Sequence, residues 1–264
     1  MRPLPCFAEC MNVRPGIEVA SLSDIGCQRE NNEDSYLYWE PAEDEEFQRK
    51  GRLAVIADGM GGHEGGQEAS RLAVETVREV YDRGFRSDPQ SALVESLVAA
   101  HTQIQVYALQ HPMFQGMGTT CTALVIRGLQ LYFAHVGDSR LYLVRDGHIL
   151  RLTRDHSYVG RLVESGIVRA EDAEKHPQRH ILTAALGAGR ELAVDGAEQG
   201  VALQGGDDVL LCTDGLWSVV TEEELESAVS KYAPAQSCAA LVELARQRGG
   251  PDNITLQVLR VERS

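Results

Sequence analysis

The apolar residues of this chain fall into short extended runs and into longer stretches with helical spacing. Extended runs occupy Ile17–Ser23, Ser35–Trp39 and Leu53–Ala57, and the last of them is predicted to end directly before an aspartate. Apolar residues at helical spacing predict a helix over Glu68–Arg83. A second helix is predicted over Pro89–Gln110, because proline suits the first turn of a helix.

The period then changes to short β-rich runs, separated by RGLQ, GDSR and RDGH. This spacing predicts an antiparallel meander. Its runs are Thr119–Ile126, Leu131–Val136, Leu141–Val144 and His148–Leu150. The following segment, Tyr158–Lys175, predicts two short helices broken at Gly166.

The last third of the chain mixes strands with helices. Strands are predicted at Val201–Leu203, Val209–Cys212 and Ile254–Leu259, with a helix at Ala235–Arg248. Thr221 precedes three glutamates and is expected to cap a helix. No internal repeat or linker divides the chain, so a single domain over residues 17–264 is expected after an irregular arm at residues 1–16. The order of elements favours an α+β fold with antiparallel sheet over a doubly wound α/β fold.

The composition is that of a globular protein. Of the 264 residues, 43% are hydrophobic and 24% are charged, which is enough apolar material for a sizeable core. The formal net charge of −14 argues against binding to nucleic acid or to an anionic membrane surface. This acidity either serves solubility alone or includes carboxylates with a chemical role. The run Glu40–Glu46 is expected to be a solvated loop.

The cysteines and the apolar runs give no sign of secretion or of a membrane span. No apolar run approaches the roughly 18–20 residues of a membrane helix, and the N-terminus lacks the pattern of a signal peptide. Six cysteines in a chain of this length do not form a disulfide framework. Cys121 and Cys212 are predicted to be buried thiols. Cys6 and Cys10 have no second pair nearby, which disfavours a zinc site. Together these features favour the cytoplasm.

Five acidic landmarks recur along the chain, each beside a glycine or in a turn. They are NED at Asn32–Asp34, DGMGGH at Asp58–His63, GDSR at Gly137–Arg140, TDG at Thr213–Gly215 and GGPDN at Gly249–Asn253. Mg²⁺ and Mn²⁺ prefer oxygen ligands, and two such ions can clamp a phosphoryl group and ionise a water. Carboxylates brought together without a cation would repel one another at high cost. The joint occurrence of these landmarks therefore predicts a two-metal hydrolase.

Taken singly, each landmark has a structural alternative. A strand followed by Asp-Gly is often only a turn, GDSR alone predicts a hairpin turn, and PDN fits an Asx-turn. The glycines after Asp58 permit close backbone approach, so that carbonyl oxygens can also face a cation. No Gly-Lys-Ser/Thr follows them, which excludes a P-loop. Cys121 and Arg127 satisfy C-x5-R, but the intervening TALVI is typical of a strand and not of a phosphate-binding loop.

In this order the motifs resemble the metal-dependent protein phosphatase family (type 2C), and specifically its compact bacterial members. The motifs are GCQRENNED (Gly26–Asp34), DGMGGH, GMGTT (Gly116–Thr120), GDSR, LTRDHS (Leu152–Ser157), HPQRHILTAALG (His176–Gly187), LLCTDGLW and PDNIT. The resemblance covers nearly the whole chain. It implies a central β-sandwich of two antiparallel sheets flanked by helix pairs, with a small helical flap. It also implies a binuclear Mn²⁺ or Mg²⁺ centre at one end of the sandwich.

The resemblance assigns the first metal site to residues from three motifs. Asp58 would bridge both metals, and the backbone carbonyl of Gly59 would bind one of them. Asp214 and Asp252 would complete the protein ligands of the first metal.

Further residues are assigned to the other metals and to the substrate. Glu33 and Asp34 would act near the second metal, one of them through bound water, and Asp138 would act at a weaker third metal. Arg29 resembles the phosphate-binding arginine of the family. Its planar guanidinium suits bidentate contact with phosphate oxygens, which lysine cannot reproduce. The alternative is that Arg29 is only a surface charge.

The chemistry implied by the resemblance needs no nucleophilic side chain. A water bridging two cations supplies hydroxide near neutral pH and attacks phosphorus in line, while the cations and Arg29 offset charge on the transferring oxygens. Animal-type members place a histidine after the Asp-Gly pair as a proposed general acid. Here that position is Met60, and the nearest histidine, His63, is the candidate general acid. A structural role for His63, or a metal-bound water as the acid, stays open.

The segment His156–His180 corresponds to the family's flap beside the active site. Its mixed charges are expected on an exposed surface. That surface either selects substrates or is a solvated helix pair with no such role.

The sequence thus predicts a cytoplasmic, monomeric, Mn²⁺- or Mg²⁺-dependent phosphatase for phosphoserine and phosphothreonine. Its expected partners are phosphorylated proteins, namely a Ser/Thr kinase and its substrates, with no nucleic acid and no membrane. One alternative is a phosphatase dedicated to a single regulatory phosphoprotein. The other is a non-catalytic pseudophosphatase that only binds phosphoproteins, and the complete carboxylate set with Arg29 argues against it.

Overall fold

The structure, a computed structural model, divides into two compact units that interleave along the chain. It describes residues 9–10, 13–61, 65–84, 88–173, 176–189, 192–197 and 199–263. Unit 1 comprises Met1–Asn32, Arg140–Leu152 and Leu203–Ser264. Unit 2 comprises Glu33–Ser139 and Thr153–Ala202. Each unit is built on one antiparallel sheet, so two sheets of the predicted kind are present.

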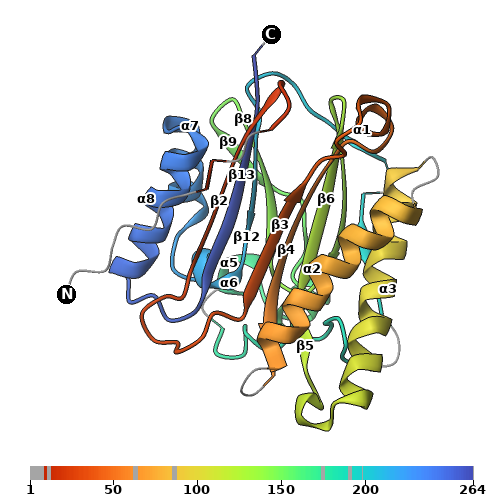
Figure 1. The fold of residues 1–264 in the computed structure, drawn as a ribbon. Coiled ribbons are helices and arrows are strands. Elements are labelled where there is room, and N and C mark those ends of the chain that lie inside the picture. Colours follow the sequence, from red (N-terminus) through yellow and green to blue (C-terminus); the bar gives the residue numbers. More distant parts are fainter. Residues whose placement is uncertain are drawn as a thin grey trace. The chain divides into compact units, whose positions relative to one another are not determined.

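Unit 1 carries the sheet with the strand order β1-β2-β13-β12-β8-β9. Its strands are β1 (Glu9–Cys10), β2 (Ile17–Asp24), β8 (Arg140–Arg145), β9 (His148–Arg151), β12 (Asp208–Cys212) and β13 (Ile254–Val261). Its helices are α6 (Asp214–Trp217), α7 (Glu222–Lys231) and α8 (Pro234–Gln247), and α8 packs on β2 and β13 (Figure 1). Apolar side chains of these elements form one buried core, with Leu256 and Leu241 among its members. Burial of this apolar face is the main favourable contribution to folding of the unit.

Unit 2 carries the sheet with the strand order β10-β7-β6-β4-β3, to which β11 and β5 add at β7 and β4. Its strands are β3 (Asp34–Trp39), β4 (Arg52–Met60), β5 (Gly118–Thr119), β6 (Cys121–Arg127), β7 (Gln130–Val136), β10 (Asp195–Gly196) and β11 (Val201–Ala202). Its helices are α1 (Asp44–Lys50), α2 (Gly65–Gly84), α3 (Pro89–Gln110), the 3-10 turn η1 (Pro112–Phe114), α4 (Tyr158–Glu164) and α5 (Ala170–Ala173). The long helices α2 and α3 lie side by side and cover one face of this sheet (Figure 1).

Most predicted elements are confirmed, including the α+β class and both flap helices. The predicted strand over Leu53–Ala57 is too short, because β4 continues through Asp58 to Met60. Its last residues are held by pairing with β5, in which Gly59 lies opposite Thr119. The carboxylate of Asp58 therefore projects from within a paired strand and not from a free strand end.

The expected antiparallel meander is wrong at the GDSR segment. The strand before it, β7, pairs with β6, β10 and β11, whereas the strand after it, β8, pairs with β12 and β9. GDSR is thus a connection between strands of two different sheets and not a hairpin turn.

The solvated loop expected over Glu40–Glu46 is also partly wrong, because α1 begins at Asp44. The first turn of α1 is acidic and its last turn is basic, which complements the helix dipole. Lys50 is buried and pairs with Glu46 and Asp82. The high density of charged residues in this segment suggested a solvated loop instead of a helix.

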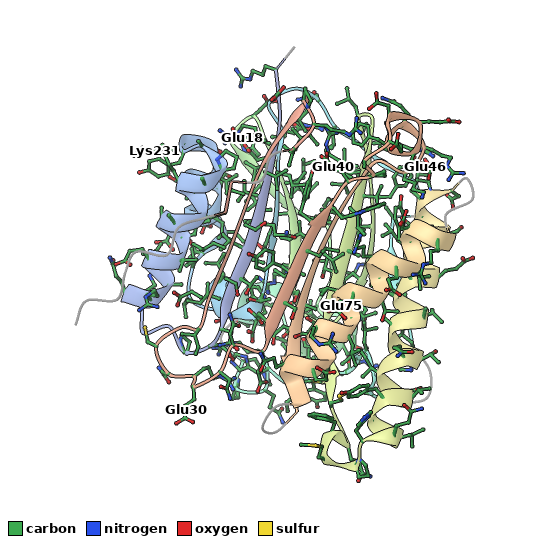
Figure 2. All side chains as sticks on the ribbon, viewed as in Figure 1. Glu18, Glu30, Glu40, Glu46, Glu75 and Lys231 are labelled. Carbon is green, nitrogen blue, oxygen red and sulfur yellow. The ribbon has the colours of Figure 1, made fainter. Side chains whose placement is uncertain are left out.

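Charged side chains balance one another locally on the helices. Figure 2 shows the side chain of Glu75, which pairs with Arg71 one turn earlier on α2. Glu46, also labelled there, pairs with Arg49. Such exposed pairs contribute little to stability. They do neutralise part of the negative charge of the chain locally, because each acidic side chain lies beside a basic one.

Two further predictions from the sequence can be compared with the structure. Cys121 and Cys212 are completely buried, as expected. Burial raises the pKa of the Cys121 thiol to about 12, so this group cannot act as a thiolate nucleophile at neutral pH. Among the residues described, no helix combines the length and the apolar character needed to cross a bilayer.

The capping of α7 provides a direct test of how local sequence stabilises unit 1. Thr221 Oγ1 accepts from the Glu224 backbone N–H, and Glu224 Oε2 accepts from the Thr221 N–H at 3.0 Å. Thr221→Ala should lower the free energy of unfolding by about 1 kcal/mol in urea titrations, because the helix loses its cap. Thr221→Ser keeps the hydroxyl and should stay close to wild type. Equal loss in both variants would show that the hydroxyl contributes nothing.

Candidate metal centre

Two of the predicted metal-binding carboxylates face each other in unit 2. Asp34 on β3 lies directly opposite Asp58 on β4 in the antiparallel register. Directly opposite residues of an antiparallel pair project their side chains on the same face, with Cβ atoms about 4.5–5.5 Å apart. Like charges at such positions destabilise the sheet, and a cation offsets that repulsion. The strand pairing therefore creates the charge arrangement that a divalent cation needs.

The backbone of Asp58 is fixed by two neighbouring threonines. Its N–H donates to Thr120 Oγ1 at 3.0 Å. Its carbonyl accepts from Thr119 Oγ1 at 2.8 Å and from the Thr120 N–H at 2.9 Å. Both backbone polar groups of Asp58 are thus bound by uncharged partners, which fixes the position of its backbone.

Glu33 and Gly59 lie together beside the start of α2. The Gly59 N–H donates to the Glu33 carbonyl at 3.1 Å. A Cβ atom on Gly59 would lie 2.1 Å from the carbonyl oxygen of Gly66, and one on Gly66 would lie 2.3 Å from Glu33 Oε2. Glycine is therefore needed at position 59, where a backbone carbonyl approaches closely, and Gly66 leaves room for the Glu33 carboxylate.

Asp138 is buried in the connection that follows β7. Gly137 before it has a φ of 114°, and its Cβ would lie 2.5 Å from Thr120 Cβ. The hydroxyl of Ser139 after it bonds to Thr120 Oγ1 at 2.8 Å. Thr120 thus contacts the residues on both sides of Asp138 as well as the backbone of Asp58, so the two predicted metal-binding segments of unit 2 share one support.

In unit 1 the predicted ligands Asp214 and Asp252 are held by a close contact between their neighbours. Asp214 is the first residue of α6, directly after β12. A Cβ on Gly215 would lie 1.9 Å from the Asn253 carbonyl oxygen, so only glycine fits there. Thr213 and Thr255 exchange further hydrogen bonds across the same strand pair, including Thr213 N–H to the Thr255 carbonyl at 3.0 Å.

Asn253 has a positioning role that the sequence analysis did not assign. Its Nδ2 donates to the carbonyls of Ile25 and Asn31, both at 2.9 Å, and so binds both ends of the loop that carries Arg29. Asn253 itself is buried, and buried side-chain amides are normally hydrogen-bonded in this way. The GGPDN motif contained this signal, since asparagine supplies both donors and acceptors where aspartate supplies only acceptors.

Arg29 forms an ion pair with one of the predicted metal ligands. Its Nη2 lies 2.6 Å from Asp252 Oδ2, and its side chain is 51% exposed. A guanidinium has five N–H donors in a fixed plane, so it can contact a carboxylate and an incoming anion from one position. The pair places a cationic, half-exposed group directly beside Asp252.

The donor types of both units fit Mg²⁺ or Mn²⁺, which prefer carboxylate and carbonyl oxygens. In the part of the chain that the structure describes, no group of three or more histidine, cysteine, aspartate or glutamate residues forms a ready metal cluster. The carboxylates are instead held as smaller sets within each unit. His63, the candidate general acid, lies outside the described residues.

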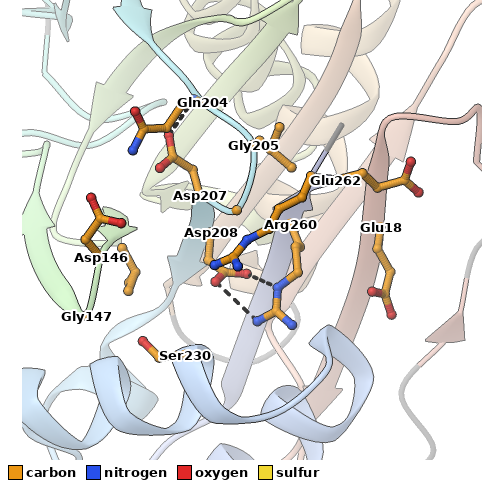
Figure 3. Close-up of a pocket in the computed structure, with 14 residues that line it drawn as sticks. Glu18, Asp146, Gly147, Gln204, Gly205, Asp207, Asp208, Ser230, Arg260 and Glu262 are labelled. Atoms are coloured by element: carbon orange, nitrogen blue, oxygen red, sulfur yellow. Dashed lines mark hydrogen bonds and ion pairs between the residues drawn. The ribbon is translucent and has the colours of Figure 1, made fainter.

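A cavity of about 450 Å³ in unit 1 contains none of the predicted site residues (Figure 3). Its wall is acidic, but the buried Asp207 pairs with Arg145 and the buried Asp208 pairs with Arg260. Burial nevertheless raises the pKa of Asp208 above its usual value. Arginines therefore balance these two carboxylates, which explains them without a ligand.

Comparison with known sequences identifies the family. The family described as Protein phosphatase 2C matches residues 29–248. This chain belongs to that family. The match includes Arg29, Asp34, Asp58, Asp138 and Asp214, so most of the positions discussed above lie within the family domain.

Several bacterial phosphatases resemble the chain over most of its length. The serine/threonine protein phosphatase PstP of Mycobacterium tuberculosis (strain H37Rv) is 37% identical over 93% of this chain, and the chain spans 45% of the length of that relative. The protein phosphatase PhpP of Streptococcus pneumoniae (strain R6) is 34% identical over 92% of this chain and 97% of its own length. A crystal structure of the PstP catalytic domain in complex with two manganese ions superposes with a TM-score of 0.78, at 34% identity, over 93% of this chain and 98% of that one.

The glycine of the Asp-Gly-Met segment gives a test of the close packing at this site. Gly59→Ala should lower the free energy of unfolding by about 1–3 kcal/mol or more, because the new methyl group would meet two backbone carbonyls, those of Gly66 and Glu33. The matched control is Gly84→Ala at the end of α2, where the nearest atom is 4.0 Å away. Gly84→Ala should leave stability unchanged or raise it. The free energy of unfolding of both variants is measured by urea titration. An unchanged value for Gly59→Ala would contradict the close packing at this position.

Proposed function

We propose that this protein is a metal-dependent protein serine/threonine phosphatase that hydrolyses phosphoserine and phosphothreonine. The observation that carries the proposal is the opposed pair Asp34 and Asp58 in a chain of the Protein phosphatase 2C family. PstP, a relative named as a serine/threonine protein phosphatase, supports the reaction type. One relative's catalytic domain binds two manganese ions, which supports Mn²⁺ as the cofactor here.

The proposed cofactor is two Mn²⁺ or Mg²⁺ ions, with a weaker third site. Asp58 and the Gly59 carbonyl, with Asp214 and Asp252, would hold the first ion, and Glu33 and Asp34 would act at the second. Asp138 would serve the third. When bound, such ions lower the pKa of water and neutralise phosphoryl oxygens. The support for this set is its donor chemistry and the family membership of the chain.

The chain's own residues have three tasks in this proposal. The carboxylates bind the cations at fixed positions, because the backbone of Asp58 is bound on both sides by Thr119 and Thr120. Arg29 orients the phosphate of the substrate and offsets its charge. His63 is the proposed proton donor to the leaving serine or threonine oxygen.

Further parts of the proposal concern the surroundings of the reaction. We propose that residues 17–264 act as one phosphatase domain, with the flap at residues 156–180 selecting substrates. The partners would be phosphorylated proteins, among them a Ser/Thr kinase and its substrates, in the cytoplasm and with the enzyme as a monomer. The net charge of −14 supports the absence of a nucleic acid partner.

The first test measures p-nitrophenyl phosphate hydrolysis with Mn²⁺ and with EDTA. Activity should require Mn²⁺ and should fall by several orders of magnitude in Asp58→Asn and Asp214→Asn, because each removes a charged ligand without changing shape. Glu75→Gln, on the exposed face of α2, is the control and should keep full activity. If the wild-type protein binds Mn²⁺ but does not hydrolyse the substrate, the hypothesis of an active phosphatase is wrong and a phosphoprotein-binding module is favoured.

The second test separates the charge of Arg29 from its geometry. Both Arg29→Lys and Arg29→Ala should lower kcat/KM for a phosphothreonine peptide by roughly 10–100-fold, since a charge-assisted hydrogen bond contributes about 1.5–3 kcal/mol. Arg71→Lys, in an exposed ion pair on α2, is the control. Full activity of Arg29→Lys would show that Arg29 supplies only charge, and full activity of Arg29→Ala would remove it from the site.

A further inference from the structure

The two ends of the flap are joined by backbone hydrogen bonds. The Tyr158 N–H donates to the Ile181 carbonyl, and the Thr183 N–H donates to the His156 carbonyl, both at 2.7 Å. We call the residues His156–Tyr158 and Ile181–Thr183 the flap stem. Because both ends are joined here, the stem decides where the rest of the flap can lie.

The flap stem is attached to Gly137, the residue before Asp138. The His156 N–H donates to the Gly137 carbonyl at 2.7 Å, and the Gly137 N–H donates to His156 Nδ1 at 3.3 Å. The same Gly137 carbonyl accepts from His135 Nε2 at 3.0 Å. His156 thus bonds to both the N–H and the carbonyl of Gly137, and His135 bonds to the same carbonyl.

His135 is a fixed, neutral part of this arrangement. Its Nε2 lies 3.0 Å from the carbonyls of Gly137 and Arg154, which can only accept, so Nε2 carries the hydrogen. Its Nδ1 then accepts from Thr122 Oγ1 at 2.8 Å. The ring is completely buried, and desolvation lowers the pKa of His135 to about 4.

The tautomer of His156 follows in the same way. Nδ1 accepts from the Gly137 N–H, so Nε2 carries the hydrogen and points to Asp195 Oδ2 at 3.2 Å. Asp195 is on β10, which pairs with β7 at the position of His135. The carboxylate of Asp195 therefore sets the orientation of the His156 ring from the sheet side.

A second link attaches the C-terminal end of the flap beside Asp58. Leu186, just beyond the stem, exchanges two hydrogen bonds with Thr119, at 2.8 and 3.1 Å. Thr119 in turn donates to the Asp58 carbonyl. The flap is therefore connected through backbone and imidazole contacts to the segments of both Asp58 and Asp138.

We propose that His156, oriented by Asp195, is a positioning residue that couples the flap stem to Asp138 and thereby sets cation affinity at the Asp138 site. This inference rests on the proposed function, in which Asp138 serves the weaker third cation. Groups that orient metal ligands through hydrogen bonds typically change metal affinity or activity by 10–100-fold when they are replaced. His156 contacts neither cation nor substrate in this proposal.

Two amide substitutions separate the two sides of the His156 ring. Asn places its amide oxygen where Nδ1 lies, so His156→Asn keeps an acceptor for the Gly137 N–H and loses the contact with Asp195. Gln reaches the position of Nε2, so His156→Gln keeps a donor for Asp195 and loses the acceptor for Gly137. His148→Gln, at an exposed position on β9, is the matched control.

The experiment is a calorimetric Mn²⁺ titration of the full chain, with the weak binding step assigned by its loss in Asp138→Asn. His156→Gln should weaken that step by roughly tenfold or more, whereas His156→Asn and His148→Gln should stay near wild type. Trypsin cleavage within the flap, where Arg161 and Arg169 lie, should be faster in His156→Gln than in His156→Asn, because its stem has lost one attachment.

Three results would overturn the coupling. One is unchanged Mn²⁺ binding in His156→Gln. Another is equal weakening in both amide variants with equal loss of thermal stability, which would indicate a merely structural role. The third is the absence of any Asp138-dependent step in wild type. If wild type still hydrolyses p-nitrophenyl phosphate with Mn²⁺, each of these results removes this inference and leaves the proposed phosphatase activity intact, although the third also removes the proposed third cation site.

Discussion

The repulsion between carboxylates placed at fixed backbone positions is the constraint on which the rest of this structure depends. Asp34 and Asp58 cannot move apart without breaking the pairing of β3 with β4, which runs on to Trp39 opposite Leu53. The pairing is supported by the buried core of unit 2 beneath α2 and α3. Apolar burial thus holds like charges together, and in the proposed function a bound divalent cation would offset their repulsion.

The glycines of the motifs serve this constraint by letting backbones approach. Gly59 and Gly66 pack β4 against the start of α2, and Gly215 packs α6 against the Asn253 carbonyl. In both units the glycine next to a predicted ligand is required by a neighbouring carbonyl and not by the cation itself. A short side chain such as aspartate reaches a metal only if its backbone is brought close. Close backbone packing is therefore the physical reason why acidic residues and glycines occur together in this sequence.

Much of the fold could be predicted from periodicity, and the misses have specific causes. Pro89 and Thr221 gave correct helix starts because capping is a local property. The GDSR segment was misassigned, because its turn residues are the same whether the next strand joins the same sheet or another one. The helix that begins at Asp44 was not predicted, because its charged residues are equally typical of a solvated loop. At the site, motifs named the carboxylates, but Asn253 and His156 act through backbone carbonyls and amides far away in sequence, which no local pattern reveals.

The support of Asp252 has a chemical consequence, because it is charged. Around Asp58 and Asp138 the supporting groups include hydroxyls, backbone amides and the neutral ring of His135. A cationic support beside a metal-binding carboxylate competes with a divalent ion for that carboxylate. Beside Asp252 the support is Arg29, a cation that in the proposed function also binds the substrate phosphate. Under that proposal, a phosphate that draws Arg29 toward itself would weaken the contact of Arg29 with Asp252, so substrate binding and cation binding would favour each other at this carboxylate.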